Sequence, residues 1–402
     1  MTDKGRIITR TVLLVSFVSF FNDISSEMLY PVMPIYLRSI GFSVLLIGML
    51  EGIAEATAGL SKGYFGNLSD LKHKRLPFIQ AGYALSAISK PLIALFIYPV
   101  WVFAARTIDR LGKGIRTGAR DAILSDESRN ENKGKVFGFH RGMDTLGAAI
   151  GPALALVYLH FYPEQYRWLF FIAFLPGLTA ILMTFFIRER KHEKETRKIS
   201  KVHFLSYFSY WKQAGKGYRL VVAGLLFFTL FNSSDVFLLL AVKEQGLSDV
   251  QMIGVYIFYN LVFALFSFPV GWLADKIGLK TMLTIGLLIF VAVYFGFGWV
   301  SSIGMFLALF LGYGLYAACT DGISKALLTN LSERKDTATA IGLFTSVASL
   351  FTLLASSVAG LIWFTLGMQW MFILSGSGVG IAVIYLFVIF RRIRPLNHTE
   401  NQ

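Results

Sequence analysis

The stretch that decides the fold is Gly66-Asn67-Leu68-Ser69-Asp70-Leu71-Lys72-His73-Lys74-Arg75, which returns 205 positions later as Gly271-Trp272-Leu273-Ala274-Asp275-Lys276-Ile277-Gly278-Leu279-Lys280. Each copy is a short charged gap between two long apolar runs. A half-chain repeat that carries the same acidic-then-basic loop twice is typical of a duplicated membrane bundle. The sequence therefore predicts a transporter, and leaves its solute open.

The composition excludes a soluble protein. Of the 402 residues, 55% are apolar and only 15% are charged, and the mean hydropathy is +0.60. A chain with so little polar surface is built for lipid, because water would face its apolar side chains. Runs of about 20 apolar residues are long enough to cross a bilayer core. Twelve are expected, near 12–37, 44–66, 77–98, 100–122, 136–160, 166–187, 218–241, 250–273, 279–299, 303–327, 338–365 and 369–390.

One long hydrophilic segment, 188–217, separates six spans from six. It predicts an N-terminal six-helix bundle over 1–187, a basic linker over 188–217 and a C-terminal bundle over 218–402. The second part of the linker, 203–212, mixes aromatic with basic residues, and we expect it to lie flat at the membrane interface.

The repeat extends beyond the loop. Phe21-Asn22-Asp23 resembles Phe231-Asn232-Ser233, and Gly112, Gly114 and Asp121 fall on Gly312, Gly314 and Asp321. We therefore predict an all-α integral membrane fold, with two pseudo-symmetric bundles of six helices facing each other across a central cavity.

Lysine and arginine concentrate at both ends of the chain and in alternate loops, whereas the loops near 98–100, 160–166 and 299–302 carry almost none. This bias places both termini in the cytoplasm and the protein in the cell (inner) membrane. It also accounts for the formal net charge of +14, so no nucleic-acid partner is expected. The lone Cys319 excludes an internal disulfide and a thiol metal cluster.

The loop pattern Gly-x-x-x-Asp-x-x-Gly-x-Lys/Arg resembles the signature of the major facilitator superfamily. The second copy carries it in full, while the first has Leu71 and His73 where a base and a glycine are usual. The fifth span, with Gly138, Gly147 and Gly151-Pro152, resembles the motif of the proton-driven exporters, although Ala155-Leu156 replaces its closing glycine pair. The resemblance implies a monomeric secondary transporter that alternates access to a central site.

A gating role is predicted for two aspartates at the ends of spans, Asp70 and Asp275. Such a carboxylate can accept hydrogen bonds from a neighbouring helix N-terminus and pair with a nearby base, here Arg75 or Lys276. The alternative is that these residues only fix the topology. In span five, Gly147 and Gly151 allow close helix packing and Pro152 permits a bend, so we assign them to gating as well, with plain packing as the alternative.

Charges at membrane depth cost about 2.5–3.5 kcal/mol each, so each needs a partner or a wet cavity. The pairs Asp23 with Glu27 and Glu51 with Glu55 are four residues apart, and Asp144 follows His140 and Arg141 in span five. Two neighbouring carboxylates in a low dielectric can share a proton. The sequence predicts proton coupling through Asp23, Glu27, Glu51, Glu55 and Asp144.

Span four carries a cationic stripe, because Arg106, Arg110, Lys113 and Arg120 fall within an arc of roughly 80°. Near the membrane surface, Arg116 and Arg120 are explained by extending their charged ends to water. The remaining bases, Arg106, Arg110 and Lys113, are predicted to bind substrate or to pair structurally with Asp23, Glu27 or Glu55. His140, Arg141, Asn232 and Asn260 complete the predicted substrate site.

The leading functional prediction is a proton-coupled carrier of a small anionic or zwitterionic organic solute, exported rather than imported, since guanidinium groups suit carboxylates and phosphates. One alternative is a transition-metal exporter with Asp23, Glu27, His140 and Asp144 as ligands, opposed by the cationic stripe. Another is a broad exporter of lipophilic drugs, with Tyr256, Tyr259, Tyr313 and Tyr316 as aromatic walls. No enzyme or cofactor motif is visible, so no cofactor, resident metal or catalytic residue is expected.

Overall fold

The computed structural model describes residues 8–30, 32–42, 44–189, 205–246, 249–300 and 302–392, and these ranges are helical without any strand. The α-helices are α1 (Arg10–Glu27), α2 (Met33–Ser39), α3 (Val44–Leu71), α4 (Leu76–Leu95), α5 (Pro99–Asp126), α6 (Lys133–Phe161), α7 (Tyr166–Thr184), α8 (Tyr210–Gln213), α9 (Lys216–Thr229), α10 (Val236–Glu244), α11 (Asp249–Ile277), α12 (Leu279–Trp299), α13 (Ile303–Asn330), α14 (Thr337–Leu366) and α15 (Met368–Arg392). Two short 3₁₀ helices, η1 (Ser206–Ser209) and η2 (Arg334–Asp336), lie in connections.

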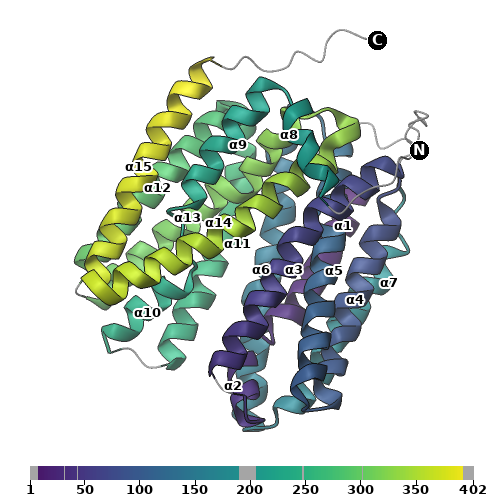
Figure 1. Cartoon of the computed structure of the whole chain (residues 1–402), viewed down its shortest axis with the longest axis vertical. Coiled ribbons are helices and arrows are strands. Elements are labelled where there is room, and N and C mark those ends of the chain that lie inside the picture. The colour runs from purple at the N-terminus through teal and green to yellow at the C-terminus, as the bar shows by residue number, and fades with distance from the viewer. Residues whose placement is uncertain are drawn as a thin grey trace.

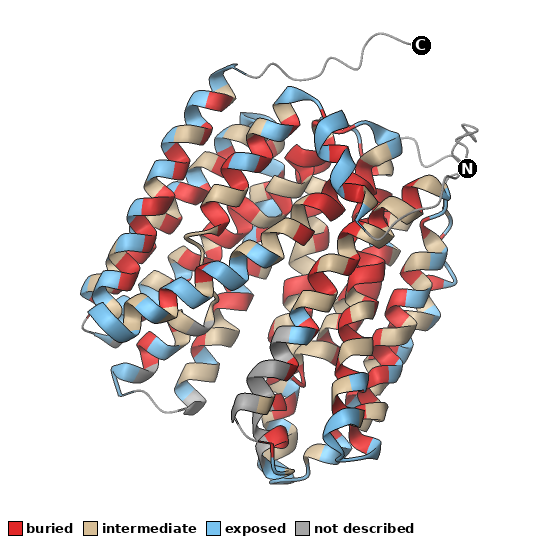
Figure 2. Ribbon diagram, viewed as in Figure 1, coloured by how far each residue is buried: buried red, intermediate tan, exposed pale blue. Residues whose placement is uncertain are grey.

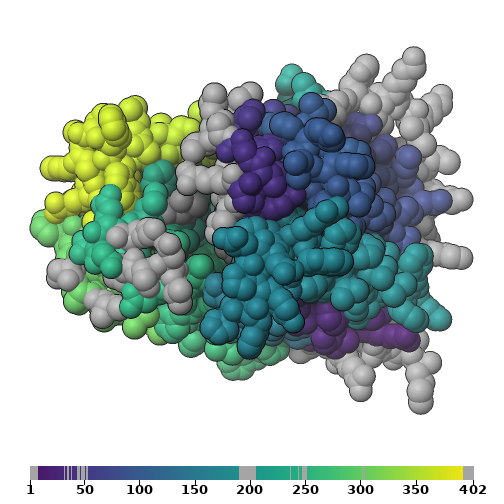
Figure 3. All heavy atoms as spheres, turned by 90° about the horizontal axis from the view of Figure 1, so that it is seen from below, coloured from purple at the N-terminus to yellow at the C-terminus, as the bar shows by residue number. Residues whose placement is uncertain are grey.

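The helices form two bundles side by side, which confirms the predicted fold class (Figure 1). In the first, α1 packs on α6 and α7, and α5 packs between α3 and α4. In the second, α12 packs on α13 and α15. The bundles meet where α6 runs along α11 and α3 runs along α14. Figure 3 shows the end of the molecule where α2 and α10 lie, with the N-terminal bundle in purple to teal and the C-terminal bundle in green and yellow.

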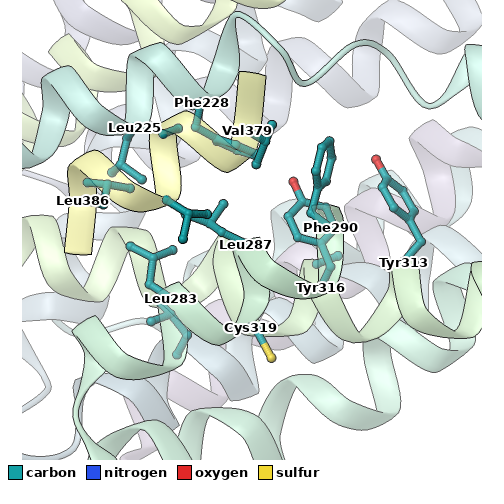
Figure 4. Close-up of a cluster of buried hydrophobic side chains, with 14 of the residues drawn as sticks. Leu225, Phe228, Leu283, Leu287, Phe290, Tyr313, Tyr316, Cys319, Val379 and Leu386 are labelled. Carbon is teal, nitrogen blue, oxygen red and sulfur yellow. The ribbon is translucent and has the colours of Figure 1, made fainter. Parts of the chain in front are cut away.

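The helices expose residues along their outward faces (Figure 2), and many of these residues are large and apolar, which suits lipid. Phe364 is 89% exposed and Leu265 is 69% exposed, for example. So many exposed large apolar side chains would be unfavourable in water. Inside the C-terminal bundle lies an aromatic core, in which Phe290 packs 3.9 Å from Tyr294 and 4.8 Å from Tyr316 between ring centroids (Figure 4). Eight of the described helices are long and apolar enough to span a membrane by composition alone. The crossings through α1, α3 and α5 are not among these eight helices. Each of the three carries interior charged residues, which lower its hydropathy.

The first and seventh crossings are each divided between two helices, which the apolar runs near 12–37 and 218–241 did not predict. The first crossing consists of α1 and α2, and the seventh of α9 and α10. Proline in the sequence around 31–34 removes backbone donors from the first crossing. In the seventh, the run Asn232-Ser233-Ser234-Asp235 favours turns over helix, and the Ser234 N–H donates to the Ser356 hydroxyl at 3.1 Å.

The two signature loops both have a positive φ at one matching position. Gly278 adopts a φ of +96°, and His73, at the matching position of the first copy, adopts a φ of +49°. The left-handed region suits glycine and costs most other residues roughly 1 kcal/mol. The first loop therefore keeps the positive φ although histidine replaces the glycine, but its turn differs: the Lys74 N–H donates to the Ser69 carbonyl, whereas the Gly278 N–H donates to the Ala274 carbonyl.

The segment before α9 packs through one face against α3 and α14, and its expected place at the membrane interface stays a prediction. Tyr207 is wholly buried, and its hydroxyl lies 2.9 Å from the Ser346 hydroxyl of α14. From α3, the Asn67 amide donates to the Ser206 hydroxyl at 3.1 Å. Only one face of this segment, with Leu205 and Trp211, stays exposed, and 190–204 lies outside the described residues.

Candidate functional site

A cavity of about 380 Å³ lies between the two bundles. Seven of its lining residues are basic (Lys62, Arg110, Lys113, Arg116, Arg120, Arg141 and Lys325), and six are acidic (Asp23, Glu27, Asp109, Asp144, Asp235 and Asp321). The two signs nearly cancel. A solute with one charge, or with one charge of each sign, therefore finds an opposite charge on the walls. Tyr256, Tyr259, Asn260 and Phe263 of α11 form the less charged side.

The basic wall comes from one face of α5. Arg110 pairs with Glu55 at 3.0 Å. The Arg116 guanidinium lies 4.6 Å above the Tyr83 ring and donates to the Ser86 hydroxyl at 2.9 Å, so no carboxylate among the described residues neutralises it. Lys113 lines the cavity and forms neither an ion pair nor a side-chain hydrogen bond within the part of the chain that the structure describes. On α5 the cavity thus presents two cations that a ligand can use, and Lys62 of α3 is a third lining cation without an ion pair among the described residues.

The expectation that Arg116 and Arg120 extend to water at the membrane surface was wrong. They are only 5% and 7% exposed. α5 is covered along its length by α3 and α4, so its far turns face the interior of the protein. Arg120 is held there by Asp121 at 3.0 Å and by Asp144 at 3.8 Å.

Behind the basic wall lies a buried charge cluster on α4 and α5. Lys90 contacts Asp109 at 2.9 Å, and Arg106 contacts the other oxygen of the same carboxylate at 3.3 Å. Arg106 does not line the cavity. The cluster anchors α4 to α5, and Lys90 and Asp109 were not among the predicted site residues because isolated charges give no periodic signal.

Two predicted proton carriers face the cavity without a basic partner. Asp23 accepts a hydrogen bond from the neighbouring Asn22 amide at 3.1 Å, and Glu27 forms no polar contact with any described side chain. Glu55 instead belongs to the ion pair with Arg110. The side chain of Glu51 lies outside the described residues.

A chain of charges crosses from one bundle to the other. Arg141 of α6 contacts Asp144 at 3.0 Å and reaches across to Asp321 of α13, with its guanidinium 5.3 Å from the Phe263 ring of α11. Lys325 of α13 contacts Asp121 of α5 at 3.1 Å. Sequence reasoning assigned no role to Asp321 and Lys325. The bounds of α5 and α13 differ by 204 positions, so the expected match of Asp121 with Asp321, at an offset of 200, was wrong.

The other predicted substrate residues divide between two chambers. Asn260 lines the charged cavity and donates to the Tyr256 carbonyl at 2.9 Å. Asn232 lines an adjoining aromatic chamber of about 310 Å³ and donates to the Tyr316 hydroxyl at 3.2 Å, with Tyr313 beside it (Figure 4). His140 lies on neither wall: it is 3% exposed, and both ring nitrogens lack a hydrogen-bond partner among the described residues.

The two bundles are latched together at the end where α1 begins and α15 ends, here called the termini face (Figure 1). Asp70 of α3 accepts hydrogen bonds from the backbone N–H and the hydroxyl of Thr339 at the start of α14, each at 2.6 Å, and pairs with Arg75. Asp275 of α11 accepts from the N–H groups of Gly134 and Lys135 at the start of α6, at 2.8 and 2.9 Å. Each bundle therefore caps the N-terminus of a helix in the other bundle. The two capping residues, Asp70 and Asp275, occupy matching positions in the internal repeat.

Glycines let the helices approach beneath these latches. A Cβ on Gly138 of α6 would come within 3.2 Å of the Gly271 Cα of α11. By contrast, Gly147 and Gly151 face α1 of their own bundle, near Asp23 and Met28. Pro152 lies inside α6, and Lys276 stacks on Trp272 at 3.5 Å rather than on the opposite bundle. The gating roles predicted for these four residues stay predictions.

Asp275→Asn is expected to open the termini face more often. The amide keeps one acceptor but loses the charge that favours a helix N-terminus, which is worth about 0.5–2 kcal/mol, so the open population should rise about twofold or more. The readout is the labelling rate of a reporter cysteine, Ser267→Cys in a Cys319→Ser background, because Ser267 is 1% exposed between α6 and α11. Glu131→Gln, which neutralises an exposed carboxylate just before α6, is the matched control. Equal labelling of both variants would contradict a latch at Asp275.

Comparison with known proteins agrees with this architecture. The sequence model of the Major Facilitator Superfamily matches residues 15–263 and 244–402. An uncharacterised MFS-type transporter of Methanocaldococcus jannaschii is 34% identical over 367 residues, which cover 90% of each chain. Citrate exporter 1 of Aspergillus niger is 22% identical over 171 residues, 42% of this chain and 32% of that one. The crystal structure of the human organic anion transporter TETRAN superposes with a TM-score of 0.81 at 18% identity, over 94% of this chain and 99% of that one. The chain belongs to the major facilitator superfamily and is a multi-pass membrane transporter.

Proposed function

We propose that this transporter is a proton-coupled exporter of a small organic anion or zwitterion. The observation that carries the proposal is the cavity between the bundles, in which Lys113, Asp23 and Glu27 line one space and form no ion pair among the described residues. A cation without a partner provides a binding charge for an anionic group, and carboxylates without a partner can exchange protons with the cavity. One site then has the groups that both substrate binding and coupling need.

The anionic group of the solute would bind at Lys113 and Arg116, because the other α5 bases that line the cavity, Arg110 and Arg120, already have carboxylate partners. Charge-assisted hydrogen bonds of this kind contribute about 1.5–3 kcal/mol each. Asp23 and Glu27 would bind a cationic group where the solute has one, and Asn260 would fix its orientation. Arg110 and Arg141 would act indirectly, by positioning the carboxylates with which they form ion pairs. Arg106 and His140 do not line the cavity and would support the residues that do.

Coupling would work through competition for the same carboxylates. A proton on Asp23 or Glu27 removes one negative charge from the cavity. At Asp23 this charge interacts electrostatically with Lys113 and Arg116. Solute and proton then favour different arrangements of the bundles 1–187 and 218–402, which rock about the cavity while Asp70 and Asp275 latch one face. In this scheme Asp144 sets the charge balance through Arg120 and Arg141.

The positive-inside bias supports a cell-membrane location with both termini in the cytoplasm, so the latched face of this structure would be the cytoplasmic one. Export is supported by the fifth-span glycine motif and by the partial likeness to a citrate exporter. We propose a monomer, because the whole cavity is built from one chain.

A broad exporter of lipophilic drugs is a second candidate, favoured by the aromatic chamber around Asn232 and Tyr316. The transition-metal alternative has less support. His140 does not reach the cavity wall, and within the described ranges no three His, Cys, Asp or Glu side chains are grouped to hold a metal ion.

Lys113→Gln is expected to lower anion transport by about 10- to 100-fold while the protein stays folded, since the change removes a charge-assisted bond worth about 1.5–3 kcal/mol. The measurement is counterflow in proteoliposomes under an imposed pH gradient, with panels of carboxylates, amino acids, divalent metals and cationic dyes. Lys135→Gln, on the neighbouring helix and away from the cavity, is the control. Unchanged anion transport in Lys113→Gln would contradict the proposal, and transport of dyes alone would favour the second candidate.

A further inference from the structure

A second polar cavity lies at the termini face, separate from the transport cavity. Its volume is about 420 Å³, and its walls come from the ends of α5 and α13 and the starts of α6 and η2. The lining residues are Ser125, Ser128, Asn130, Lys133, Thr329, Ser332, Glu333 and Arg334. None of them lines the transport cavity.

The cavity obeys the internal repeat. Ser125 and Ser128 at the end of α5 correspond, at an offset of 204, to Thr329 and Ser332 at the end of α13. All four hydroxyl residues are at most 7% exposed. Each bundle thus contributes a matching pair of hydroxyl groups to one chamber between them.

Two buried polar side chains in this cavity have no partner among the residues that the structure describes. Lys133 is 5% exposed, yet its ammonium group forms no hydrogen bond or ion pair with any described residue. The Ser125 hydroxyl, in a residue 7% exposed, likewise has no partner in the described part of the chain. Burying an ammonium ion without a compensating group is expensive, so this arrangement indicates a ligand with negative charge.

The surrounding charges favour the same ligand. Arg334 of the opposite bundle and Asp126 are the charged groups that act on Lys133. Asp126 lies 4.0 Å from Arg75, and Glu333 is paired with Lys335 at 3.0 Å. Asp126 and Glu333 are thus each close to another base. Lys133 from one bundle and Arg334 from the other therefore give the chamber an excess of positive charge.

We propose that this cavity binds a phosphate group, which bridges Lys133 of the N-terminal bundle and Arg334 of the C-terminal bundle and so holds the termini face closed. A tetrahedral oxyanion offers acceptors on several sides, which matches donors that approach from both bundles. The Ser125 hydroxyl donates a further bond. The ligand binds only while the bundles are together, so it acts as a regulator of the transport cycle whatever solute is carried.

The first test is the thermal stability of the purified full-length protein in phosphate against chloride at equal ionic strength. We expect a saturable rise in Tm for the wild type, retained in Lys133→Arg and lost in Lys133→Gln. Lys135→Gln is the matched control, two residues along the same helix and outside the cavity. Arg334→Gln, at an exposed position, should weaken the rise and covers the case in which Lys133→Gln does not fold. An equal rise in Lys133→Gln and wild type, or no saturable rise at all, would overturn the proposal.

The second test measures closure of the termini face directly. At ten times the dissociation constant, a ligand that binds one state only should shift the equilibrium, and thus slow labelling of the Ser267→Cys reporter, by about tenfold. Inorganic phosphate and nanodiscs with or without phosphatidic acid form the two arms. Slowing by either source supports the site and identifies whether the phosphate group is free or part of a lipid. Binding that leaves labelling unchanged would overturn the regulatory role.

Discussion

Arg141→Gln is expected to reduce transport by about 30-fold or more. Arg141 links Asp144 of its own bundle to Asp321 of the other. Its removal leaves two carboxylates facing each other across the interface, and truncating one partner of a buried charge pair costs about 2–5 kcal/mol. The lower end applies here because the Arg141 side chain is 32% exposed to the cavity. The initial rate of counterflow in proteoliposomes measures the loss.

The double variant Arg141→Gln/Asp321→Asn separates the bridge from mere packing. If the loss arises from uncompensated carboxylates, removing one of them should restore part of the transport, and the coupling in a double-mutant cycle should exceed 1 kcal/mol or so. Arg167→Gln, an exposed arginine on α7, is the control for a lost guanidinium. Strictly additive effects of Arg141→Gln and Asp321→Asn would show that the two residues do not act together.

The fold could be predicted because its signals repeat along the chain. Apolar runs of membrane length located the crossings, and the two copies of the signature loop defined the halves. The breaks in the first and seventh crossings were missed for a physical reason. Hydropathy is blind to a helix that unwinds inside protein, where a contact such as that of the Ser234 N–H with the Ser356 hydroxyl satisfies the freed backbone.

The site was only partly accessible from the sequence. Helical spacing showed that α5 carries a line of bases, but not which of them would be neutralised. Arg110 is paired because α3 brings Glu55 to it, whereas Lys113, three residues on, is left unpaired. Whether a base is free depends on the neighbouring helices, and one sequence does not encode that in any local pattern. The inter-bundle contact of Arg141 with Asp321 is of the same kind, since the two residues lie 180 positions apart.

The glycine at position 138 gives the sharpest test of how the termini face closes. Gly138→Val is expected to abolish most transport, by at least about tenfold, without unfolding either bundle. The first Cβ atom would already meet the Gly271 Cα at 3.2 Å and the Ser267 carbonyl. Both are backbone groups, which cannot rotate away, and overpacking of this kind typically costs about 1–3 kcal/mol. That cost falls only on the state in which α6 and α11 are together.

The variant should therefore favour the state that is open at the termini face. Labelling of the Ser267→Cys reporter should be faster by the same factor of about ten or more, while Tm changes little, because each bundle keeps its own core. Gly254→Val is the matched control on α11, since a Cβ at Gly254 meets no atom within 4 Å. If Gly138→Val labelled no faster than Gly254→Val, close contact of α6 with α11 would not be what seals this face. The bundles would then have to be held together by the two aspartate caps alone.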